Sequence, residues 1–255
     1  MYNVDIYPSP YDNELEYKYA GRFGAKGEKR KKKKKPTPAQ VAYQNWRHKI
    51  NLIRRTIKLN YYEHDLWVRL SYQRGERKGM GEVKGDFKKF YEKLGRRYKK
   101  LGVELKWIRV IEIGKRGGIH VHVLINRIPG ADTDVMIAEC WPHGYTHYTN
   151  LHNSGGFQGL AEYMAKQPDE EEREEKGLPP KLTKEEYSYS TSRNLIRPSP
   201  IRKTYYHWTM RRILKDGPKP TPGYYIDKST LEMGVNPYTG YPYLRYTEVK
   251  LNRRI

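Results

Sequence analysis

The sequence contains very little cysteine and no long apolar run. Cys140 is the single cysteine among 255 residues, which excludes a fold held by internal disulfides and fits a reducing cytoplasm. No segment approaches the roughly 20 consecutive apolar residues that span a bilayer, and the first residues lack the apolar stretch of a signal peptide. We therefore expect a cytoplasmic protein with no membrane partner.

Phenylalanine and acidic residues are also scarce. There are 4 Phe and 5 Trp against 24 Tyr, and 29 Asp and Glu oppose 50 Lys and Arg, which leaves a formal charge of +21. Such an excess attracts polyanions, so nucleic acid is the expected partner. Tyrosine rings beside basic residues suit unpaired bases, because each base stack contributes about 1–3 kcal/mol. The alternative is that tyrosine replaces phenylalanine in a small, hydrated core.

Composition divides the chain into three parts. Residues 1–35 end in a lysine-rich run, which predicts a basic disordered arm that contacts nucleic acid. Residues 36–215 carry the periodic apolar patterns of one domain, interrupted by an acidic, Pro-containing loop at 168–184. Residues 216–255 are rich in Pro and Tyr and form a C-terminal extension of open function.

The central part predicts an α+β fold. Amphipathic periods alternate with β-forming runs in the order helix, strand, helix, strand, strand, helix, strand, helix. This order favours a central antiparallel β-sheet flanked by helices. The expected helices are 37–59, 86–101, 133–141, 157–167 and a last one at about 200–215, and the expected strands are 64–72, 105–113, 119–126 and 144–150.

The most informative segment is the hairpin around Arg116. His120 and His122 lie two apart on a strand and therefore share one face. If the loop is centred on Arg116, Glu112 stands directly opposite His120, and opposed residues have Cβ atoms about 4.5–5.5 Å apart. A one-residue slip would send Glu112 to the other face. Two imidazoles and a carboxylate converging from adjacent strands predict a divalent-metal site.

A candidate nucleophile follows the hairpin. Tyr163 and Lys166 lie three apart on an expected helix and project from one face. A tyrosine hydroxyl, with a pKa near 10, needs a neighbouring cation or metal to become a good nucleophile. Lys166 can supply that charge.

The histidine pair of His120-Val121-His122, followed by Tyr163-Met164-Ala165-Lys166, resembles the HUH endonuclease superfamily, and within it the single-tyrosine initiators of rolling-circle plasmids and single-stranded DNA viruses. The first motif of that family would correspond to Trp67–Tyr72, where Arg69 and Tyr72 depart from the usual small hydroxyl residues. A segment at Tyr189–Asn194 is similar to one found after the tyrosine motif in related proteins. The resemblance covers roughly residues 60–200.

The resemblance implies an RNA-recognition-like sheet and a defined chemistry. Tyr163 would attack a phosphodiester of single-stranded DNA at an origin stem-loop, become linked to the 5′ phosphate and free a 3′ hydroxyl for replication, with strand joining as the reverse step. Mg²⁺ or Mn²⁺ would bind Glu112, His120 and His122.

The resemblance also implies further partners. Lys115, Arg116 and Arg193 would contact DNA. The sequence contains no phosphate-binding loop of the Gly-x-x-x-x-Gly-Lys-Ser/Thr type, so a host helicase and a host polymerase would complete the reaction in a cytoplasm expected to be prokaryotic.

Two other classes of protein stay open. A single-tyrosine transposase of the same superfamily has the same order of motifs, whereas a relaxase usually has three histidines and an N-terminal tyrosine. A basic protein that binds single-stranded nucleic acid without cutting it would carry these histidines incidentally. Replacing Tyr163 with Phe separates the enzymes from the binding protein.

Overall fold

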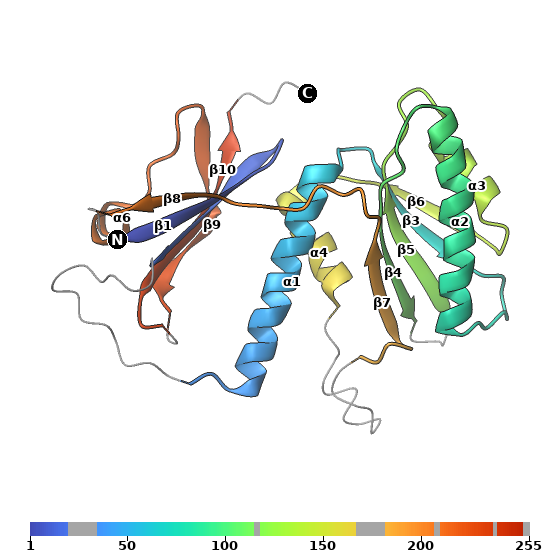
Figure 1. Ribbon diagram of the computed structural model, residues 1–255, viewed down its shortest axis with the longest axis horizontal. Coiled ribbons are helices and arrows are strands. Elements are labelled where there is room, and N and C mark those ends of the chain that lie inside the picture. Colours follow the sequence, from blue (N-terminus) through green and yellow to red (C-terminus); the bar gives the residue numbers. More distant parts are fainter. Residues whose placement is uncertain (20–34, 115–117, 167–181, 207–209, 237–238, 252–255) are drawn as a thin grey trace. The chain divides into compact units, whose positions relative to one another are not determined.

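The chain forms two compact units (Figure 1). One comprises Met1–His48 and Arg197–Ile255, and the other comprises Lys49–Ile196. None of the helices in the described part of the chain combines the length and apolar character needed to cross a bilayer. The computed structural model describes residues 1–19, 35–114, 118–166, 182–206, 210–236 and 239–251.

The unit Lys49–Ile196 contains an antiparallel sheet with the strand order β6-β3-β5-β4-β7. Helices α2 and α3 cover one face, and α4 and the last turns of α1 cover the other (Figure 1). This α+β arrangement confirms the expected fold class. The strands are β3 (Leu66–Ser71), β4 (Trp107–Ile113), β5 (Ile119–Ile125), β6 (Thr146–Asn150) and β7 (Tyr187–Thr191), and the helices are α1 (Pro38–Asn60), α2 (Met80–Lys100), α3 (Thr133–Cys140), the short 3₁₀ turn η1 (Ser154–Phe157) and α4 (Gln158–Ala165).

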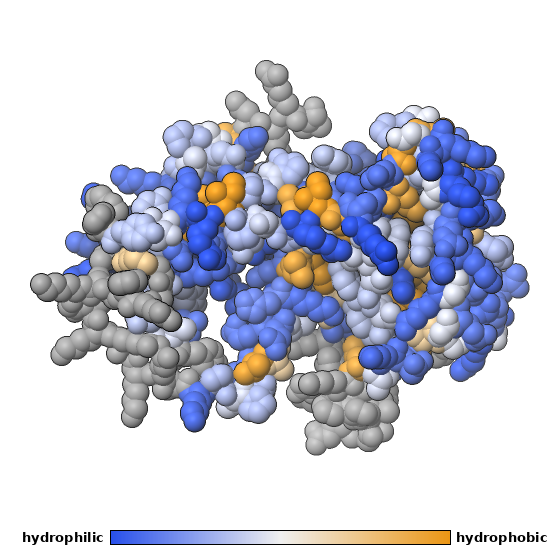
Figure 2. Space-filling view, viewed as in Figure 1, coloured by the Kyte–Doolittle hydropathy of each residue, from blue (hydrophilic) through white to orange (hydrophobic). Residues whose placement is uncertain are grey.

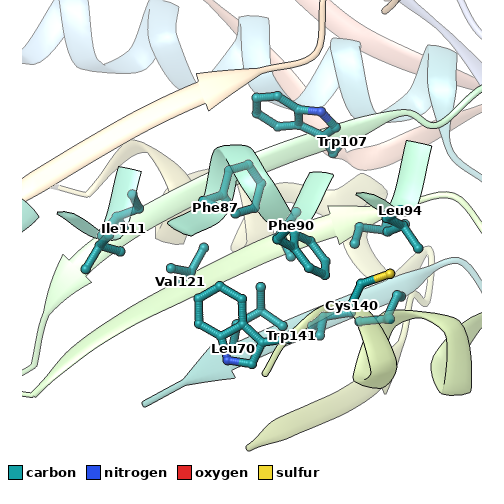
Figure 3. Packing of buried hydrophobic residues seen from close by; sticks show 14 of the residues in the cluster. Leu70, Phe87, Phe90, Leu94, Trp107, Ile111, Val121, Cys140 and Trp141 are labelled. Carbon is teal, nitrogen blue, oxygen red and sulfur yellow. The ribbon is translucent and has the colours of Figure 1, made fainter. Parts of the chain in front are cut away.

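The main core lies between the sheet and α2. Alternate residues of β3 and β5 point toward the helix and are fully buried, as the strand period of two requires. Figure 3 shows Phe87, Phe90 and Leu94 of α2 packed over Val121 and its neighbours on the sheet. The outward surface of α2 is hydrophilic (Figure 2), so the helix has one apolar face and one solvated face.

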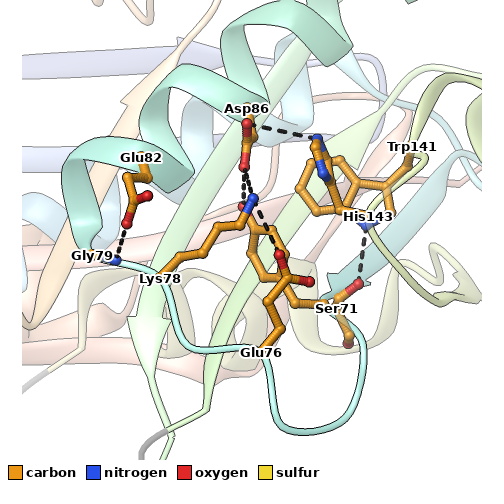
Figure 4. Close-up of polar contacts among 9 residues, drawn as sticks. Ser71, Glu76, Lys78, Gly79, Glu82, Asp86, Trp141 and His143 are labelled. Atoms are coloured by element: carbon orange, nitrogen blue, oxygen red, sulfur yellow. Dashed lines mark hydrogen bonds and ion pairs between the residues drawn. The ribbon is translucent and has the colours of Figure 1, made fainter.

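Helix α2 begins six residues before the expected start at Asp86. The Gly79 amide donates a hydrogen bond to the Glu82 carboxylate at 2.8 Å, which satisfies one of the free amides at the helix start. Asp86 is therefore not a cap. Its carboxylate accepts hydrogen bonds from the Tyr72 hydroxyl at 3.1 Å and from Lys78 at 3.0 Å, within the polar cluster of Figure 4.

The opposite face of the sheet carries a second buried layer. Ile108, Val110 and Leu124 are buried on this face, beneath α4 and the end of α1. Two hydrogen bonds join these helices: Arg54 donates to the Gln158 side chain at 2.7 Å, and Lys49 donates to the Ala165 carbonyl at 3.3 Å. The C-terminal end of α4 is thereby fixed over β4 and β5.

The second unit is a separate sheet with the order β8-β1-β2-β10-β9. One face packs Tyr2, Val4, Leu15, Leu244 and Tyr246 into a core with residues of the short helix α6. The elements are β1 (Tyr2–Pro8), β2 (Asp12–Tyr19), β8 (Ile201–Tyr205), α6 (Arg211–Asp216), β9 (Tyr224–Val235) and β10 (Pro242–Lys250).

The other face of this sheet is charged. Asp5 is completely buried and pairs with Arg202 and with Lys18, whose ammonium lies 2.9 Å from the Asp5 carboxylate. A buried carboxylate needs such partners, because an unpaired buried charge is strongly destabilising.

This second unit corrects three sequence expectations. The disordered arm over residues 1–35 is wrong for β1 and β2, and the last helix at 200–215 is β8 followed by α6. Residues 216–255, expected as an extension, supply β9 and β10. Because β1 and β2 pair with strands about 200 positions later in the sequence, their local patterns give no signal. Residues 20–34, with most of the lysine run, and 167–181, with most of the acidic loop, lie outside the described residues.

Candidate active site

The β4–β5 hairpin has the register that the sequence predicts. Glu112 is paired with His120, and Val110 is paired with His122. Glu112, His120 and His122 therefore share the face of the sheet opposite α2. The nearest approach between them joins His122 Nε2 to Glu112 Oε1, at 3.6 Å.

Helix α4 brings Tyr163 and Lys166 to the same carboxylate. The Tyr163 hydroxyl donates a hydrogen bond to Glu112 Oε1 at 2.7 Å, and the Lys166 ammonium donates to Glu112 Oε2 at 2.8 Å. Both oxygens of Glu112 are thus engaged by side chains from about fifty residues later in the chain. The helical spacing and the hairpin register, predicted separately, meet at Glu112.

Aromatic rings surround the Tyr163 hydroxyl. The Trp67 ring stacks on His122, with centroids 5.6 Å apart and planes at 22°. The Tyr163 ring meets both edge-on, at 5.9 Å from Trp67 and 5.3 Å from His122. Such contacts restrict the tyrosine to a narrow range of orientations while 39% of its surface stays exposed to solvent.

Tyr187 supports the end of α4 from the neighbouring strand. It is paired with Glu112 across β4 and β7, and its hydroxyl donates a hydrogen bond to the Met164 carbonyl. The Lys49 ammonium lies 5.0 Å from the centre of the Tyr187 ring, a cation–π distance. These contacts hold the backbone between Tyr163 and Lys166.

The electrostatics of the site keep the nucleophile neutral. Burial, and then the hydrogen bond to the Glu112 carboxylate, raise the pKa of Tyr163 far above its usual value. Burial raises the pKa of Glu112, but the Lys166 ion pair and the Tyr163 hydrogen bond outweigh it, so the net pKa is lowered and the carboxylate is ionised. Burial lowers the pKa of His122 to about 4 and also lowers the pKa of His120.

The chemistry of the donor set fits a divalent cation. Both histidines are neutral at physiological pH, and Nδ1 of each is buried without a hydrogen-bond partner among the described residues. Neutral imidazoles and an ionised carboxylate are suitable ligands. As the side chains stand, however, no group of three or more His, Cys, Asp and Glu residues in the described part of the chain is arranged to hold a metal ion. Binding would require small side-chain rotations.

The remaining predicted contacts are less defined. Lys115 and Arg116 lie outside the described residues. Arg193 is exposed in the turn that follows β7. Cys140, whose spacing to His143 is zinc-like, is buried in the core, while His143 faces Asp86 at 3.6 Å.

Sequence reasoning misses three contributors to the site. Trp67 and Arg69 enter the sequence argument only as parts of an atypical first motif, although the alternation of β3 places both on the active face, where Arg69 is paired with His122. Tyr187 carries no sequence signal, because only the three-dimensional pairing of β4 with β7 reveals it.

Comparison with known proteins agrees with the location of this site. Residues 65–168 match the family model of the replication-associated protein ORF2. The matched segment is less than half of the chain, and it contains Glu112, His120, His122, Tyr163 and Lys166. No curated protein and no solved structure matches the chain. The family match supports a role in DNA replication.

Proposed function

We propose that the unit Lys49–Ile196 is a replication-initiation endonuclease that nicks single-stranded DNA at an origin stem-loop through Tyr163. The observation that carries this proposal is the shared carboxylate: Glu112 bonds the Tyr163 hydroxyl and the Lys166 ammonium beside His122. A positioned hydroxyl, a base and a cation within hydrogen-bond distance are the parts that nucleophilic catalysis requires.

The bond changes are as follows. The Tyr163 oxygen forms a bond to phosphorus, the bond from phosphorus to the 3′ oxygen breaks, and that oxygen leaves with a proton as a 3′ hydroxyl. Glu112 already accepts the Tyr163 hydrogen bond at 2.7 Å, so it lies where a base would receive the tyrosine proton. Lys166, bonded to the same carboxylate, lies where it can offset charge that develops on the phosphate.

A divalent cation belongs to this proposal. Glu112, His120 and His122 would hold Mg²⁺ or Mn²⁺, which when bound supplies Lewis-acid polarisation of the scissile phosphate. The protein contributes the neutral imidazoles and the ionised carboxylate. The 5′ phosphotyrosine would be resolved by attack of a 3′ hydroxyl, which joins strands, and a host helicase and polymerase would extend the freed end.

The test is formation of a covalent adduct. Purified protein is mixed with a randomised pool of single-stranded stem-loop DNA, with Mn²⁺ or with EDTA, and separated on a denaturing gel. We expect a DNA-linked band that requires the metal and disappears in Tyr163→Phe. The matched control is Tyr62→Phe, an exposed tyrosine of the same unit, which keeps the band.

Other outcomes would assign other functions. Metal-dependent cutting without a covalent band would move the nucleophile to water, and binding without cutting would support a plain single-strand-binding protein. A single-tyrosine transposase would give the same adduct but would select DNA from element ends rather than from an origin.

A further inference from the structure

Strands β3 and β6 carry exposed side chains on the same face as the candidate active site. The register pairs Arg69 of β3 with His122 of β5 on one side and with His147 of β6 on the other. Trp67 is likewise paired with Thr149. Because opposed residues share a face, an exposed row of side chains leads from the catalytic histidines to the edge of the sheet.

Tyr145 ends this row. The Ser71 amide donates a hydrogen bond to the Tyr145 carbonyl at 2.9 Å, which continues the β3–β6 ladder by one residue. Tyr145 lies two positions before His147 and therefore faces the same side. Its ring is 73% exposed, although a tyrosine ring is largely apolar.

The backbone beneath Tyr145 is firmly held. The Trp141 indole donates to the Ser71 carbonyl at 3.0 Å, a contact that Figure 4 shows, and the Gln73 amide donates to the His143 carbonyl at 3.0 Å. Gly144 passes so close to β3 that an added Cβ would lie 2.4 Å from the Ser71 carbonyl oxygen. A ring presented on a fixed backbone loses less conformational entropy on binding than a ring on a mobile loop.

These features match a single-stranded nucleic acid. An exposed flat ring suits an unpaired base, and an exposed guanidinium suits a phosphate. Duplex DNA offers no unstacked base to such a ring. Neighbouring strands are about 4.8 Å apart, so β6 lies roughly 10 Å from β5, within reach of the nucleotides next to the one bound at Tyr163.

We infer that the β6 strip, defined as Tyr145, His147 and Thr149 with Trp67 and Arg69 of β3, binds the single strand on one side of the scissile phosphodiester. Tyr145 stacks on an unpaired base, and Arg69 contacts a phosphate between that base and the catalytic tyrosine. The inference rests on the proposed function for the position of the scissile bond. The strip sets which nucleotide is held next to the cut.

The test measures binding and its salt dependence in the full-length protein. A short, fluorescent single-stranded oligonucleotide of mixed sequence is titrated with wild type and variants, and anisotropy gives the dissociation constant at several salt concentrations. Tyr145→Ala should weaken binding by roughly 5- to 150-fold, the loss expected for one base stack, whereas Tyr145→Phe should stay within about twofold. The matched control Tyr62→Ala, also an exposed tyrosine, should bind as the wild type does.

Arg69 gives a second readout. Each phosphate contact on a single strand contributes about −0.7 to the slope of log K against log salt. Arg69→Ala should therefore make the slope shallower by about 0.7, and Arg69→Lys should keep it. Because Arg69 and Tyr145 are exposed, thermal unfolding of these variants should match the wild type, which excludes misfolding as the cause.

The failure of the strip and the failure of the nuclease give different results. If wild type forms the Tyr163 adduct but Tyr145→Ala and Arg69→Ala bind DNA as tightly as wild type, the strip is refuted and the nuclease stands. If wild type forms no adduct but both variants lose binding as described, the nuclease is refuted and the strip stands as a single-strand-binding surface.

Discussion

Replacing Glu112 with glutamine tests the centre of the proposed site with a small change of shape. Glutamine keeps the length of the side chain and one oxygen that can accept the Tyr163 hydrogen bond. It removes the negative charge that pairs with Lys166 at 2.8 Å, and it presents an amide group in place of the second oxygen. The substitution therefore separates the charge of Glu112 from its volume.

The cost in stability follows from the exposure of the pair. The Glu112 side chain is only 13% exposed, while the Lys166 side chain is 36% exposed and can turn toward solvent. A hydrogen bond to a charged group contributes about 1.5–3 kcal/mol, and solvation of the released lysine reduces this to about 1–2 kcal/mol. For a domain of this size we expect the melting temperature to fall by about 2–8 °C.

The effect on the reaction should be far larger. A base positioned on the nucleophile contributes typically 10²- to 10⁴-fold, so adduct formation in Glu112→Gln should fall by roughly 100-fold or more at a temperature where the protein is folded. The matched control is Glu162→Gln, which removes the same charge one residue from Tyr163, where the carboxylate accepts a hydrogen bond from Gln158 at 2.6 Å. Adduct formation by Glu112→Gln at the wild-type rate would refute the assignment of Glu112, whatever its melting temperature.

Two further predictions concern the framework. Bonding to Arg202 at 2.8 Å lowers the pKa of Asp5 from 3.8 to about 2 despite burial, so Asp5 contributes about 2 kcal/mol above pH 4 that is lost as pH falls toward 2; Asp5→Asn should flatten acid unfolding in that window, and an unchanged acid profile would contradict this. Gly144→Ala should lower the melting temperature sharply because its Cβ would overlap the Ser71 carbonyl, whereas Gly85→Ala, in an open position within α2, should raise stability by about 0.5–1 kcal/mol in the same denaturation assay.

The sequence predicts the site better than it predicts the limits of the fold. The hairpin register follows from a five-residue loop and a period of two, which are local rules, so Glu112 and His120 can be paired without a structure. The face of α4 follows in the same way from helical spacing. By contrast, Tyr187 reaches the site only through pairing with β4, a contact that no local pattern encodes.

The N-terminal strands show the same limit from the other side. Val4, Leu15 and Tyr17 alternate as strands require, but a short alternating run beside a long lysine tract resembles part of a disordered arm. Their partners in β8 and β10 stand at the far end of the chain. Composition alone describes a segment by its neighbours in sequence, whereas the free energy of a strand comes mainly from the strands on either side of it.

Glu112 connects the structural and the chemical arguments, because it aligns Tyr163 and also holds it protonated. A carboxylate that accepts the phenolic hydrogen bond favours the neutral tyrosine, as the raised pKa of Tyr163 reflects after the effect of burial. A free phenolate is therefore disfavoured in this arrangement. Under the proposed function, the tyrosine proton must move as the bond to phosphorus forms, when negative charge leaves the tyrosine oxygen. The hydrogen bond to Glu112 then acts in the reaction itself, and Lys166, by pairing with Glu112, keeps the carboxylate ionised until the DNA is in place.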